Sequence, residues 1–599
     1  MKKTSSRFAL ALAALAALPS LALAQAAAGQ SPVTPGIEAR RQALDALLAE
    51  QWEYTMRTSP EFASILGDKR FNDKLSEASE KAILEDLEET KKFLTRFEAV
   101  DTTGFPEQEQ LNRTLMVRDL KDRIDGAKFE NWLMPVNQFS SLHLQMPQLV
   151  PLLPFTNVQD YEDYIARLKQ IPRVFDETKD LMAKGMSRKL MPPKILLDKV
   201  APQVEKILAI TVEEAPFSQP VQNFPEGIGA ADQKRLKEGV LTAVRDLVYP
   251  AYARFGAYVK SDYAPQGRPE PGIWSLPDGE ARYAALVKSS TTTSMTPEEI
   301  HQLGLREVAR IEGEMLGVAK KLGFDDLKAF NAAIVKNPAL HPKSRQEILD
   351  LYRKYTDQFW REMPKLFGRL PKAKVEILPT EEFREKESAG AEYFSGTPDG
   401  SRPGNVRVNT GDFANRLTLS IETTAYHEGI PGHHLQTSIA QELKSLPPFR
   451  QQGFNVAYVE GWALYSERLG REAGFFQDPY SFYGHLQDEM LRAIRLVADT
   501  GFHYRRWTRQ QVVGFFHAHS GIEEVEVQSE TDRYIAIPSQ ALGYKIGQLK
   551  FIELREYAQK EMGPKFDIRA FHDEVLGGGS LPMEVLDARV RAWVAAQKP

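Results

Sequence analysis

The stretch DYEDYIARLKQIPRVFDETKDLMAKGM, residues 160–186, shows the pattern that recurs through most of this chain of 599 residues. Its apolar side chains return every three or four positions, which places them on one face of an α-helix. That face carries Tyr161, Tyr164, Leu168, Ile171 and Val174. Similar spacing runs through residues 38–100. We therefore predict a mainly α-helical fold, with a helical domain in the first half of the chain.

Strand-like segments are rare in comparison. Residues 372–378 (KAKVEIL) and 405–410 (NVRVNT) alternate or carry β-branched side chains between turn-forming residues, as short strands do. A turn-rich segment at 264–279 interrupts the helices and fits a domain boundary or a loop that lines a cleft. The sequence thus predicts a small β-sheet in a helical protein.

The N-terminus reads as a secretory signal peptide. Basic residues, among them Lys2 and Lys3, precede an apolar alanine- and leucine-rich run that ends in an A-x-A pattern at residues 22–24. This order predicts cleavage after about Ala24, and the run is short for a transmembrane span. Residues 25–36 are rich in small residues and predict a flexible lead-in. We expect an exported protein, either periplasmic or secreted.

Composition excludes several classes of protein. Hydrophobic residues make up 42% and charged residues 26% of the chain, as in soluble globular proteins. The formal net charge of −5 carries no basic excess, so nucleic acid is not an expected partner. The absence of cysteine excludes thiol nucleophiles and lipid attachment at the cleavage site, and limits metal ligands to His, Asp and Glu. The sequence has no second hydrophobic run, so we do not expect a membrane anchor. The oligomeric state stays open.

The stretch AYHEGIPGHHLQ, residues 425–436, holds three of the eleven histidines. His427-Glu428 matches the start of the zinc-protease pattern H-E-x-x-H. Pro431, however, stands where that pattern requires its second histidine. The stretch therefore matches the pattern only if the helix that carries it is distorted.

A regular helix brings no pair of these histidines to one metal ion. His433 lies about 9 Å along the axis from His427 and on another face, and His434 lies about two turns away. Proline and the glycines beside it accept backbone angles that break a helix, and a turn widened by two residues would return His433 toward His427. The alternative is that the helix simply ends here and that His433 or His434 caps its carbonyls. We interpret the stretch as H-E-x-x-(P-G)-H, with His427 and His433 as metal ligands and Glu428 as general base.

A third ligand is available on the next helical segment, FNVAYVEGWALYSERLG, residues 454–470. Gluzincin-type sites take a glutamate from such a helix, which points to Glu460. The residues around Glu460 are apolar, and a carboxylate among them needs a partner. Glu467 follows seven residues later on the same face. The alternative is that both glutamates belong to a solvated acidic face.

Candidate hydrogen-bond donors for a reaction intermediate stand further along the chain. Tyr, His and Arg are the usual donors to the oxyanion of a tetrahedral intermediate. The segments LRAIRLVADTGFHYRRW and ETDRYIAIPSQALGYKIGQLK supply Asp499, His503, Arg533, Tyr534, Tyr544 and Lys545. Taken one at a time, residues of these types more often serve packing than catalysis.

Four motifs, YHEGIPGHHLQ, EGWALYSE, ADTGFH and PSQALGYKIG, closely resemble the bacterial domain-of-unknown-function family 885. QWEYTMRTSPEFASILGDKRFND, MPPKILLDKV and TPEEIHQLGLREVARIEGEM also resemble it, so that the resemblance covers essentially the whole mature chain. Members of that family are mostly uncharacterised exported proteins viewed as zinc metallopeptidases. The resemblance implies a large two-lobed, mainly α fold with a small β-sheet beside the active-site helix. We place an N-terminal helical lobe at 37–290 and a catalytic lobe at 291–599.

The motif order is also similar to that of the thermostable carboxypeptidase and thimet oligopeptidase families. Their H-E-x-G-H-x-L aligns with HEGIPGHHL when two residues are inserted, which places their G-H on Gly432-His433. The insertion leaves open whether His433 or His434 is the second ligand. The similarity implies Glu460 as the third ligand of one zinc ion and Tyr544 near the substrate.

In those families an edge strand precedes the metal helix and pairs with the substrate backbone. The segment GNVRVNT occupies the corresponding place. By this similarity, Val408 and Asn409 are expected to bind substrate by strand addition.

These residues predict metal-assisted hydrolysis of short peptides, by an oligopeptidase or a carboxypeptidase. Zinc would lower the pKa of a water molecule, and Glu428 would take its proton and pass it to the leaving amine. Tyr544, with His503 or Arg533, would donate to the oxyanion. Glu467 or Asp499 would orient a histidine ligand from behind. His434 would likewise contact the ligands and not the metal. Tyr534 and Lys545 would contact the substrate.

Two other functions stay open at this point. A zinc amidase or deacylase acting on a non-peptide amide would use the same ligands. An exported metal-binding or peptide-binding protein without catalysis would need the ligands but not Glu428.

Overall fold

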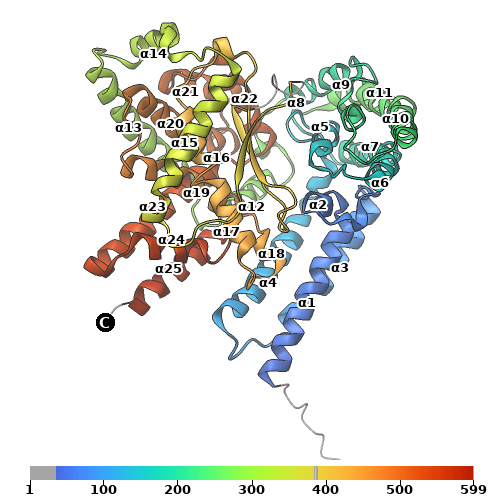
Figure 1. Ribbon diagram of the computed structural model, residues 1–599, viewed down its shortest axis with the longest axis horizontal. Coiled ribbons are helices and arrows are strands. Elements are labelled where there is room, and N and C mark those ends of the chain that lie inside the picture. Colours follow the sequence, from blue (N-terminus) through green and yellow to red (C-terminus); the bar gives the residue numbers. More distant parts are fainter. Residues whose placement is uncertain (1–35, 383–384, 386–388, 598–599) are drawn as a thin grey trace, which may run out of the picture.

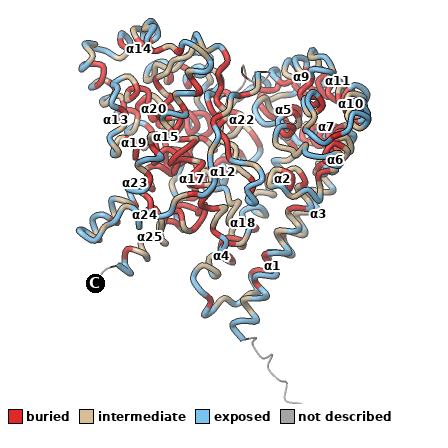
Figure 2. Tube along the Cα trace, in the orientation of Figure 1, coloured by how far each residue is buried: buried red, intermediate tan, exposed pale blue. Residues whose placement is uncertain are grey.

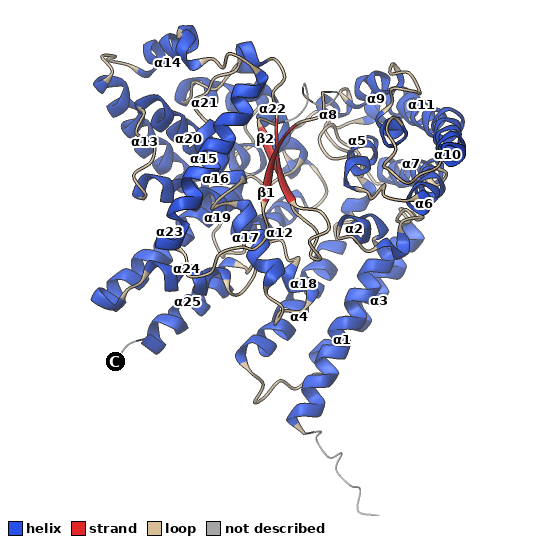
Figure 3. Cartoon of the chain, viewed as in Figure 1, coloured by secondary structure: helices blue, strands red, loops and turns tan. Residues whose placement is uncertain are grey.

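The computed structural model describes residues 36–382, 385 and 389–597. The predicted signal peptide, its cleavage after Ala24 and all but the last residue of the lead-in lie outside the described residues. Helices dominate the rest of the chain, and a single small sheet lies among them (Figure 3). The prediction of a mainly α-helical fold is confirmed.

The first four helices form an elongated arm (Figure 1). They are α1 (Ile37–Thr58), α2 (Pro60–Ile65), α3 (Glu80–Glu98) and α4 (Glu107–Ala127). Apolar residues at helical spacing, such as Leu44 and Leu48 on α1, pack against Phe93 and Phe97 of α3. Leu115 of α4 belongs instead to a core formed mainly by the second half of the chain, so that the arm is joined to that half.

The next helices share a hydrophobic core of their own, and we call them the α5–α11 unit. They are α5 (Leu142–Leu149), α6 (Val158–Leu168), α7 (Ile171–Ser187), α8 (Lys194–Leu197), α9 (Val200–Leu208), α10 (Ala230–Ala243) and α11 (Tyr249–Tyr258). The apolar stripe of residues 160–186 predicted one continuous helical pattern. In the structure it is divided between two helices, α6 and α7, and Pro172 occupies the first turn of α7. All five residues of that stripe are buried.

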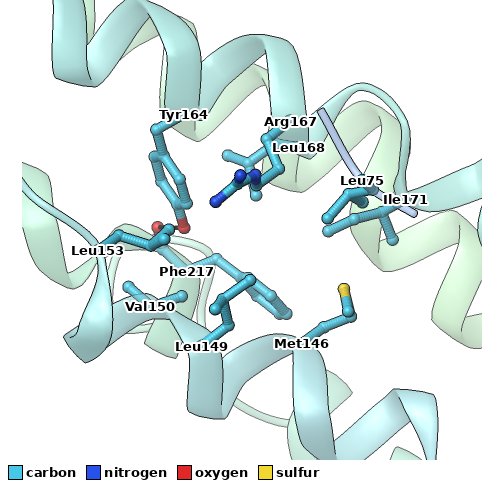
Figure 4. Close-up of a pocket in the computed structure, with 10 residues that line it drawn as sticks. All are labelled: Leu75, Met146, Leu149, Val150, Leu153, Tyr164, Arg167, Leu168, Ile171 and Phe217. Atoms are coloured by element: carbon cyan, nitrogen blue, oxygen red, sulfur yellow. Dashed lines mark hydrogen bonds between the residues drawn. The ribbon is translucent and has the colours of Figure 1, made fainter. Parts of the chain in front are cut away.

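A small cavity lies inside the α5–α11 unit (Figure 4). Its lining is apolar except for the side chains of Tyr164 and Arg167. The cavity measures about 10 Å³, which is about the space of one water molecule. It is therefore too small to bind a substrate.

The second half of the chain holds the remaining helices. They are α12 (Gly279–Thr291), α13 (Pro297–Lys321), α14 (Leu327–Lys336), α15 (Arg345–Leu366), α16 (Ile421–Glu428), α17 (His433–Glu442), α18 (Pro448–Gln451), α19 (Val456–Glu472), α20 (Pro479–His503), α21 (Arg509–His519), α22 (Glu524–Ala536), α23 (Leu542–Met562), α24 (Ile568–Leu576) and α25 (Met583–Gln597). The most extensive helix contacts join α19 to α23 and α13 to α20. Tyr283 of α12 packs with Leu496 and Leu542 of this half. The boundary between two lobes at residue 290 stays a prediction.

The sheet has three strands in the order β1-β3-β2. β1 (Val375–Pro379) pairs with β3 (Gly404–Val408) in parallel, and β2 (Ala391–Phe394) pairs with the other side of β3 in antiparallel fashion. The two predicted strand segments correspond to β1 and β3, whereas β2 was not predicted.

The position of β3 contradicts the expected strand addition at Val408 and Asn409. The Thr380 N–H donates to the Val408 carbonyl at 2.8 Å, and the Asn409 N–H donates to the Gly390 carbonyl at 2.9 Å. Both sides of β3 are therefore already paired, and a substrate has no free edge there. The prediction of substrate binding at these two residues is wrong.

Burial is greatest around α16, α17, α19 and α20, at the centre of the second half (Figure 2). The outer faces of the arm and of the α5–α11 unit are exposed (Figure 2). Among the described helices, none is both long enough and apolar enough to span a membrane. The central helices are those that carry the histidine and glutamate candidates.

Candidate metal centre

The predicted distortion lies between α16, which ends at Glu428, and α17, which begins at His433. The Gly432 N–H donates to the Tyr426 carbonyl at 2.9 Å. This bond reaches back six residues, whereas an α-helical bond reaches back four. The helix is therefore opened by two residues at the Pro-Gly step, which confirms the predicted widened turn.

Packing explains why this turn keeps its shape. A Cβ on Gly432 would overlap the carbonyl oxygens of His427 and Tyr426, so only glycine fits there. The Pro431 carbonyl accepts a hydrogen bond from Trp462 Nε1 at 2.9 Å and another from Ser466 Oγ at 3.1 Å. Both donors lie on α19, so this helix holds the turn in place.

The widened turn brings three side chains together at one point. One nitrogen each of His427 and His433 and one oxygen of Glu460 all lie within 4.8 Å of one another. Glu460 Oε2 is 3.6 Å from His427 Nε2 and 3.5 Å from His433 Nε2. Ligands about 2.0–2.1 Å from a tetrahedral zinc ion lie roughly 3.3–3.4 Å apart. The two distances from Glu460 to the histidines are close to this spacing, so the three side chains are placed to hold one metal ion.

A carboxylate behind His427 fixes the orientation of its ring. Glu467 Oε1 lies 2.7 Å from His427 Nδ1. The other oxygen, Oε2, accepts a hydrogen bond from Thr423 Oγ1 at 2.8 Å and lies 3.5 Å from His485 Nδ1. A carboxylate on Nδ1 keeps the proton there and leaves the Nε2 lone pair for a metal. Of the two acids predicted to orient a histidine, Glu467 is the one that contacts a ligand.

Glu428 borders the same cluster. Its Oε1 is 4.0 Å from His427 Nε2, and its Oε2 accepts a hydrogen bond from the Tyr393 N–H of β2 at 2.9 Å. Burial raises the pKa of the Glu428 carboxyl, although the nearby histidines oppose this shift. The carboxylate is therefore held beside the ligands without joining them.

The carboxylates make this cluster attractive to a cation. Burial lowers the pKa of His427, but its contacts with Glu460 and Glu467 outweigh this effect and raise the pKa to about 10. Burial opposes ionisation of Glu460, and the two histidines nevertheless hold its pKa far below the usual range. Positive charge is therefore stabilised between these residues.

Tyr544 lies on α23 beside the part of α19 that carries Glu460. Gly461 of α19 and Gly547 of α23 are in backbone contact, and Tyr544 stands three residues before Gly547 on a neighbouring part of the same face. Arg533 Nη2 donates to the Tyr544 hydroxyl oxygen at 3.1 Å. The predicted pair of Tyr544 and Arg533 is therefore together, with the tyrosine hydroxyl hydrogen left for another acceptor.

His434 lies outside this cluster although it follows a proposed ligand. Its Nε2 contacts the Ala373 carbonyl at 3.1 Å, and its Nδ1 lies 3.2 Å from the Tyr393 hydroxyl. Both ring nitrogens are thus used by other parts of the fold. The geometry favours His433 over His434 as the second ligand.

His503 and Asp499 are also held elsewhere. The Ile273 N–H donates to His503 Nδ1 at 3.0 Å, and His503 Nε2 lies 3.0 Å from the Tyr534 carbonyl. Asp499 accepts from the Tyr283 hydroxyl at 2.7 Å and from the Ser539 N–H at 2.9 Å. Ile273 of the turn-rich segment 264–279 thus engages one ring nitrogen of His503, and the Tyr534 carbonyl engages the other. Neither nitrogen is left for a substrate. Asp499 orients a loop, not a histidine ligand.

The expected substrate contacts of Tyr534 and Lys545 are wrong, because both side chains are buried in the core. The Tyr534 hydroxyl donates to Glu530 at 2.7 Å. Lys545 has a side-chain exposure of 0% and forms ion pairs with Glu489 at 2.6 Å and Glu307 at 3.1 Å. Helical spacing alone did not show which face of α22 and α23 is covered.

The sequence reasoning missed three residues that build the site. Tyr393 joins β2 to Glu428 through its N–H. It was not predicted because the sequence of this short strand does not differ from that of the loops around it. Thr423 stands four residues before His427 on one helix face, a spacing that would have revealed it. His485 comes from α20, and no local pattern connects it to Glu467.

Two solved structures share this fold. A "putative lipoprotein" from Colwellia psychrerythraea superimposes with a TM-score of 0.88 at 28% sequence identity, covering 93% of this chain and 100% of that chain. A "putative lipoprotein of unknown function" from Shewanella oneidensis gives a TM-score of 0.70 at 18% identity, covering 93% and 99%. The second likeness concerns the fold alone.

No curated protein sequence matches this chain. A family profile described as "Bacterial protein of unknown function (DUF885)" matches residues 60–590. The match spans most of the chain and includes α2 to α4 of the arm, the α5–α11 unit and every residue of the histidine–glutamate cluster. The chain therefore belongs to the DUF885 family of bacterial proteins.

Proposed function

We propose that this protein is a zinc-dependent peptidase that hydrolyses short peptides. The observation that carries the proposal is the convergence of His427, His433 and Glu460 beside the carboxylate of Glu428, which is not one of the three clustered side chains. A pure binding site would need the three ligands alone. A carboxylate placed next to the open position is what a hydrolytic site requires.

The donor set suits zinc. Two imidazole nitrogens and one carboxylate oxygen form the His₂Glu set of catalytic zinc sites, which leave a fourth position open. His427, His433 and Glu460 would hold the ion, and Glu467 would hold His427 in the tautomer that binds it. When bound, zinc would polarise the scissile carbonyl and lower the pKa of the attacking water.

Glu428 would carry the proton in this reaction. Its carboxylate would accept a proton from the attacking water and deliver it to the nitrogen of the leaving amine. The Tyr393 N–H holds one oxygen of Glu428 at 2.9 Å, so the second oxygen is the one that faces the ligands, at 4.0 Å from His427 Nε2. Burial raises the pKa of the Glu428 carboxyl, although His427 and His433 oppose this shift, and a carboxylate shifted in this direction is a better general base.

The edge of β2, not β3, would bind the substrate backbone. In an antiparallel pair, alternate residues direct both N–H and C=O away from the partner strand. The Tyr393 N–H points to Glu428 and hence away from β3, and Ala391, two residues earlier, has the same orientation. Since the Tyr393 N–H is engaged by Glu428, an extended peptide would add to β2 through the Tyr393 carbonyl and the backbone of Ala391, which places its own backbone beside the general base.

Tyr544 would stabilise the oxyanion. Its hydroxyl oxygen already accepts from Arg533, so its hydrogen is available for the developing negative charge. Arg533 acts through Tyr544 and is a positioning residue. His503 has no part in this mechanism, because both of its ring nitrogens are engaged.

We also propose that the protein is exported. The two similar structures are described as lipoproteins, and the N-terminal sequence has the order of a signal peptide. The present chain contains no cysteine, so the lipid attachment implied by those descriptions does not extend to it.

The proposal is tested by metal analysis and peptide cleavage with wild-type protein and Glu428→Gln. We expect about one zinc ion per chain in both proteins and a loss of about 10²- to 10⁴-fold in kcat for the variant. Glu472→Gln is the matched control, because Glu472 lies on the surface of α19 in an ion pair with Arg555.

Two results would contradict the proposal. Wild-type protein without stoichiometric zinc would remove the metal site. Equal cleavage by wild type and Glu428→Gln would remove the mechanism even with zinc present. If the protein cleaved only non-peptide amides, it would be an amidase and not a peptidase. If it bound peptides without cleaving them, it would be a binding protein.

A further inference from the structure

Phe139 is an aromatic side chain held in the open by a well-ordered turn. It has a relative exposure of 44%. Asn137 Oδ1 accepts hydrogen bonds from the N–H groups of Phe139 and Ser140, both at 2.8 Å, and the Ser141 hydroxyl donates to the Asn137 carbonyl at 2.6 Å. The turn therefore presents the ring to solvent although burial would be favourable.

The turn that carries Phe139 is attached to the opposite half of the molecule. Gln138 Nε2 donates to the Asp532 carbonyl of α22 at 3.4 Å. Gln203 of α9 donates to the Gln138 carbonyl at 2.9 Å. Lys199, at the start of α9, forms an ion pair with the Asp532 carboxylate. These contacts fix the position of Phe139 relative to α22.

The ring of Phe139 is linked to the proposed oxyanion donor, Tyr544, through Arg533. The Arg533 guanidinium lies over the Phe139 ring, 5.6 Å from its centroid, and also donates to the Tyr544 hydroxyl. One arginine thus links the exposed ring to Tyr544 on α23, the helix that packs against α19 near Glu460. The guanidinium covers one side of the ring and leaves the rest of it to a ligand.

We propose that Phe139 forms an apolar subsite that recognises a large aromatic or aliphatic side chain of the peptide, close to the scissile bond. The proposal rests on the proposed function, because it places the substrate between the metal ligands and Tyr544. The turn before α5 thereby supplies specificity to a site whose chemical groups all come from the second half of the chain.

An aromatic side chain suits this position better than a charged one. Phe139 offers an apolar face, and the charge of Arg533 is already shared with Glu530 at 3.1 Å and with the rings of Phe139 and Tyr544. Covering an apolar ring with a large apolar side chain corresponds to about 10- to 100-fold in affinity or in kcat/KM. A small side chain would leave the ring in water.

The test compares peptides that differ at one residue, phenylalanine or alanine, with that residue moved to each position around the cleaved bond. We expect wild type to favour phenylalanine by about 10- to 100-fold in kcat/KM at one position. Phe139→Ala should lose most of this preference and keep its rate on the alanine peptide. Phe139→Trp should retain the preference, because it restores an aromatic face.

Trp360→Ala is the matched control, because Trp360 of α15 has a similar exposure of 42% and belongs to neither the proposed site nor the turn that carries Phe139. This variant should keep the wild-type preference. A Phe139→Ala variant that loses activity on both peptides equally, or that keeps the full preference, would overturn the proposal.

Binding measured by calorimetry separates this proposal from the proposed function. Glu428→Gln and the double variant Glu428→Gln/Phe139→Ala are titrated with the same peptides. We expect the double variant to bind the phenylalanine peptide about 10-fold more weakly and the alanine peptide equally well. Equal binding of both peptides by both proteins would refute the apolar subsite, even if zinc-dependent cleavage were observed. Absence of zinc and of cleavage would refute the proposed function and leave the binding comparison to decide on Phe139.

Discussion

Glu467 shows how a residue behind the proposed ligands can set the properties of the proposed metal site. Its carboxylate contacts His427, Thr423 and His485 at once. Burial opposes its ionisation, yet its histidine contacts hold the pKa of Glu467 well below the usual range. His433 lacks such support, since its Nδ1 has no hydrogen-bond partner among the described residues. The two proposed histidine ligands are thus held to different degrees.

We expect Glu467→Gln to weaken zinc binding by about 10- to 100-fold, because the amide cannot match the charge-assisted bond to His427 Nδ1. Competition between the protein and a coloured zinc chelator measures this affinity. Glu472→Gln, on the exposed end of the same helix, should bind zinc as wild type does. If Glu467→Gln retained wild-type affinity, the orientation of His427 would have to come from its packing alone.

The broken helix is the element on which the site depends. Two short helices, α16 and α17, meet at a turn where Gly432 has no room for a side chain. The turn carbonyl of Pro431 is held by Trp462 and Ser466 on α19, the helix that also supplies Glu460. One helix therefore supports the distortion and completes the ligand set.

We expect Gly432→Ala to lower the free energy of unfolding by about 1–3 kcal/mol, the usual effect of forcing extra volume into a packed site. It should also remove zinc, because relief of the clash moves His433 away from His427. Denaturant unfolding and metal analysis measure the two effects. Gly313→Ala is the control, since a Cβ at Gly313 in α13 meets no atom within 4 Å. Wild-type zinc content in Gly432→Ala would show that the turn tolerates a different path.

Local sequence predicted the broken helix because its cause is local. On a regular helix, His427 and His433 could not bind one metal ion. Pro431 and Gly432 then indicated where the helix is distorted. Glu460 was found because an acidic residue in an apolar segment needs a partner. These inferences use distances along one or two helices, which sequence spacing determines.

Tertiary packing decided the predictions that were wrong. Val408 precedes the metal helix as expected, but the strand order puts β2 between β3 and the site. Lys545 lies on a helix face that α13 and α20 cover. His503 is engaged by a loop 230 residues earlier in the chain. No spacing within a single element carries this information.

At the scale of the whole molecule, Asp499 joins three distant segments. It lies on α20, accepts from Tyr283 of α12 and accepts from the N–H of Ser539 in the loop before α23. Ser539 has a φ of 71°, in the left-handed region that non-glycine residues rarely adopt. Burial raises the pKa of Asp499 to about 7, although Tyr283 and Ser539 oppose this shift.

This raised pKa predicts how global stability depends on pH. In the unfolded chain Asp499 loses its proton near pH 4, whereas in the folded protein it keeps the proton until about pH 7. Between these values the folded state binds more protons, so the free energy of unfolding falls as the pH rises. This one group contributes at most about 1.4 kcal/mol per pH unit. The stabilisation is complete below pH 4 and is lost as the pH passes 7.

Asp499→Asn isolates this effect, because asparagine cannot ionise and can still accept from Ser539. Denaturant unfolding of zinc-free wild type and variant is compared at pH values from 4 to 8. We expect the variant to gain stability relative to wild type as the pH rises, by about 1–3 kcal/mol over the whole range. Asp357→Asn, at an exposed position on α15, should show a constant difference from wild type. A constant difference for Asp499→Asn as well would mean that Asp499 is ionised throughout, and that the three segments are joined by a charged carboxylate instead of a neutral one.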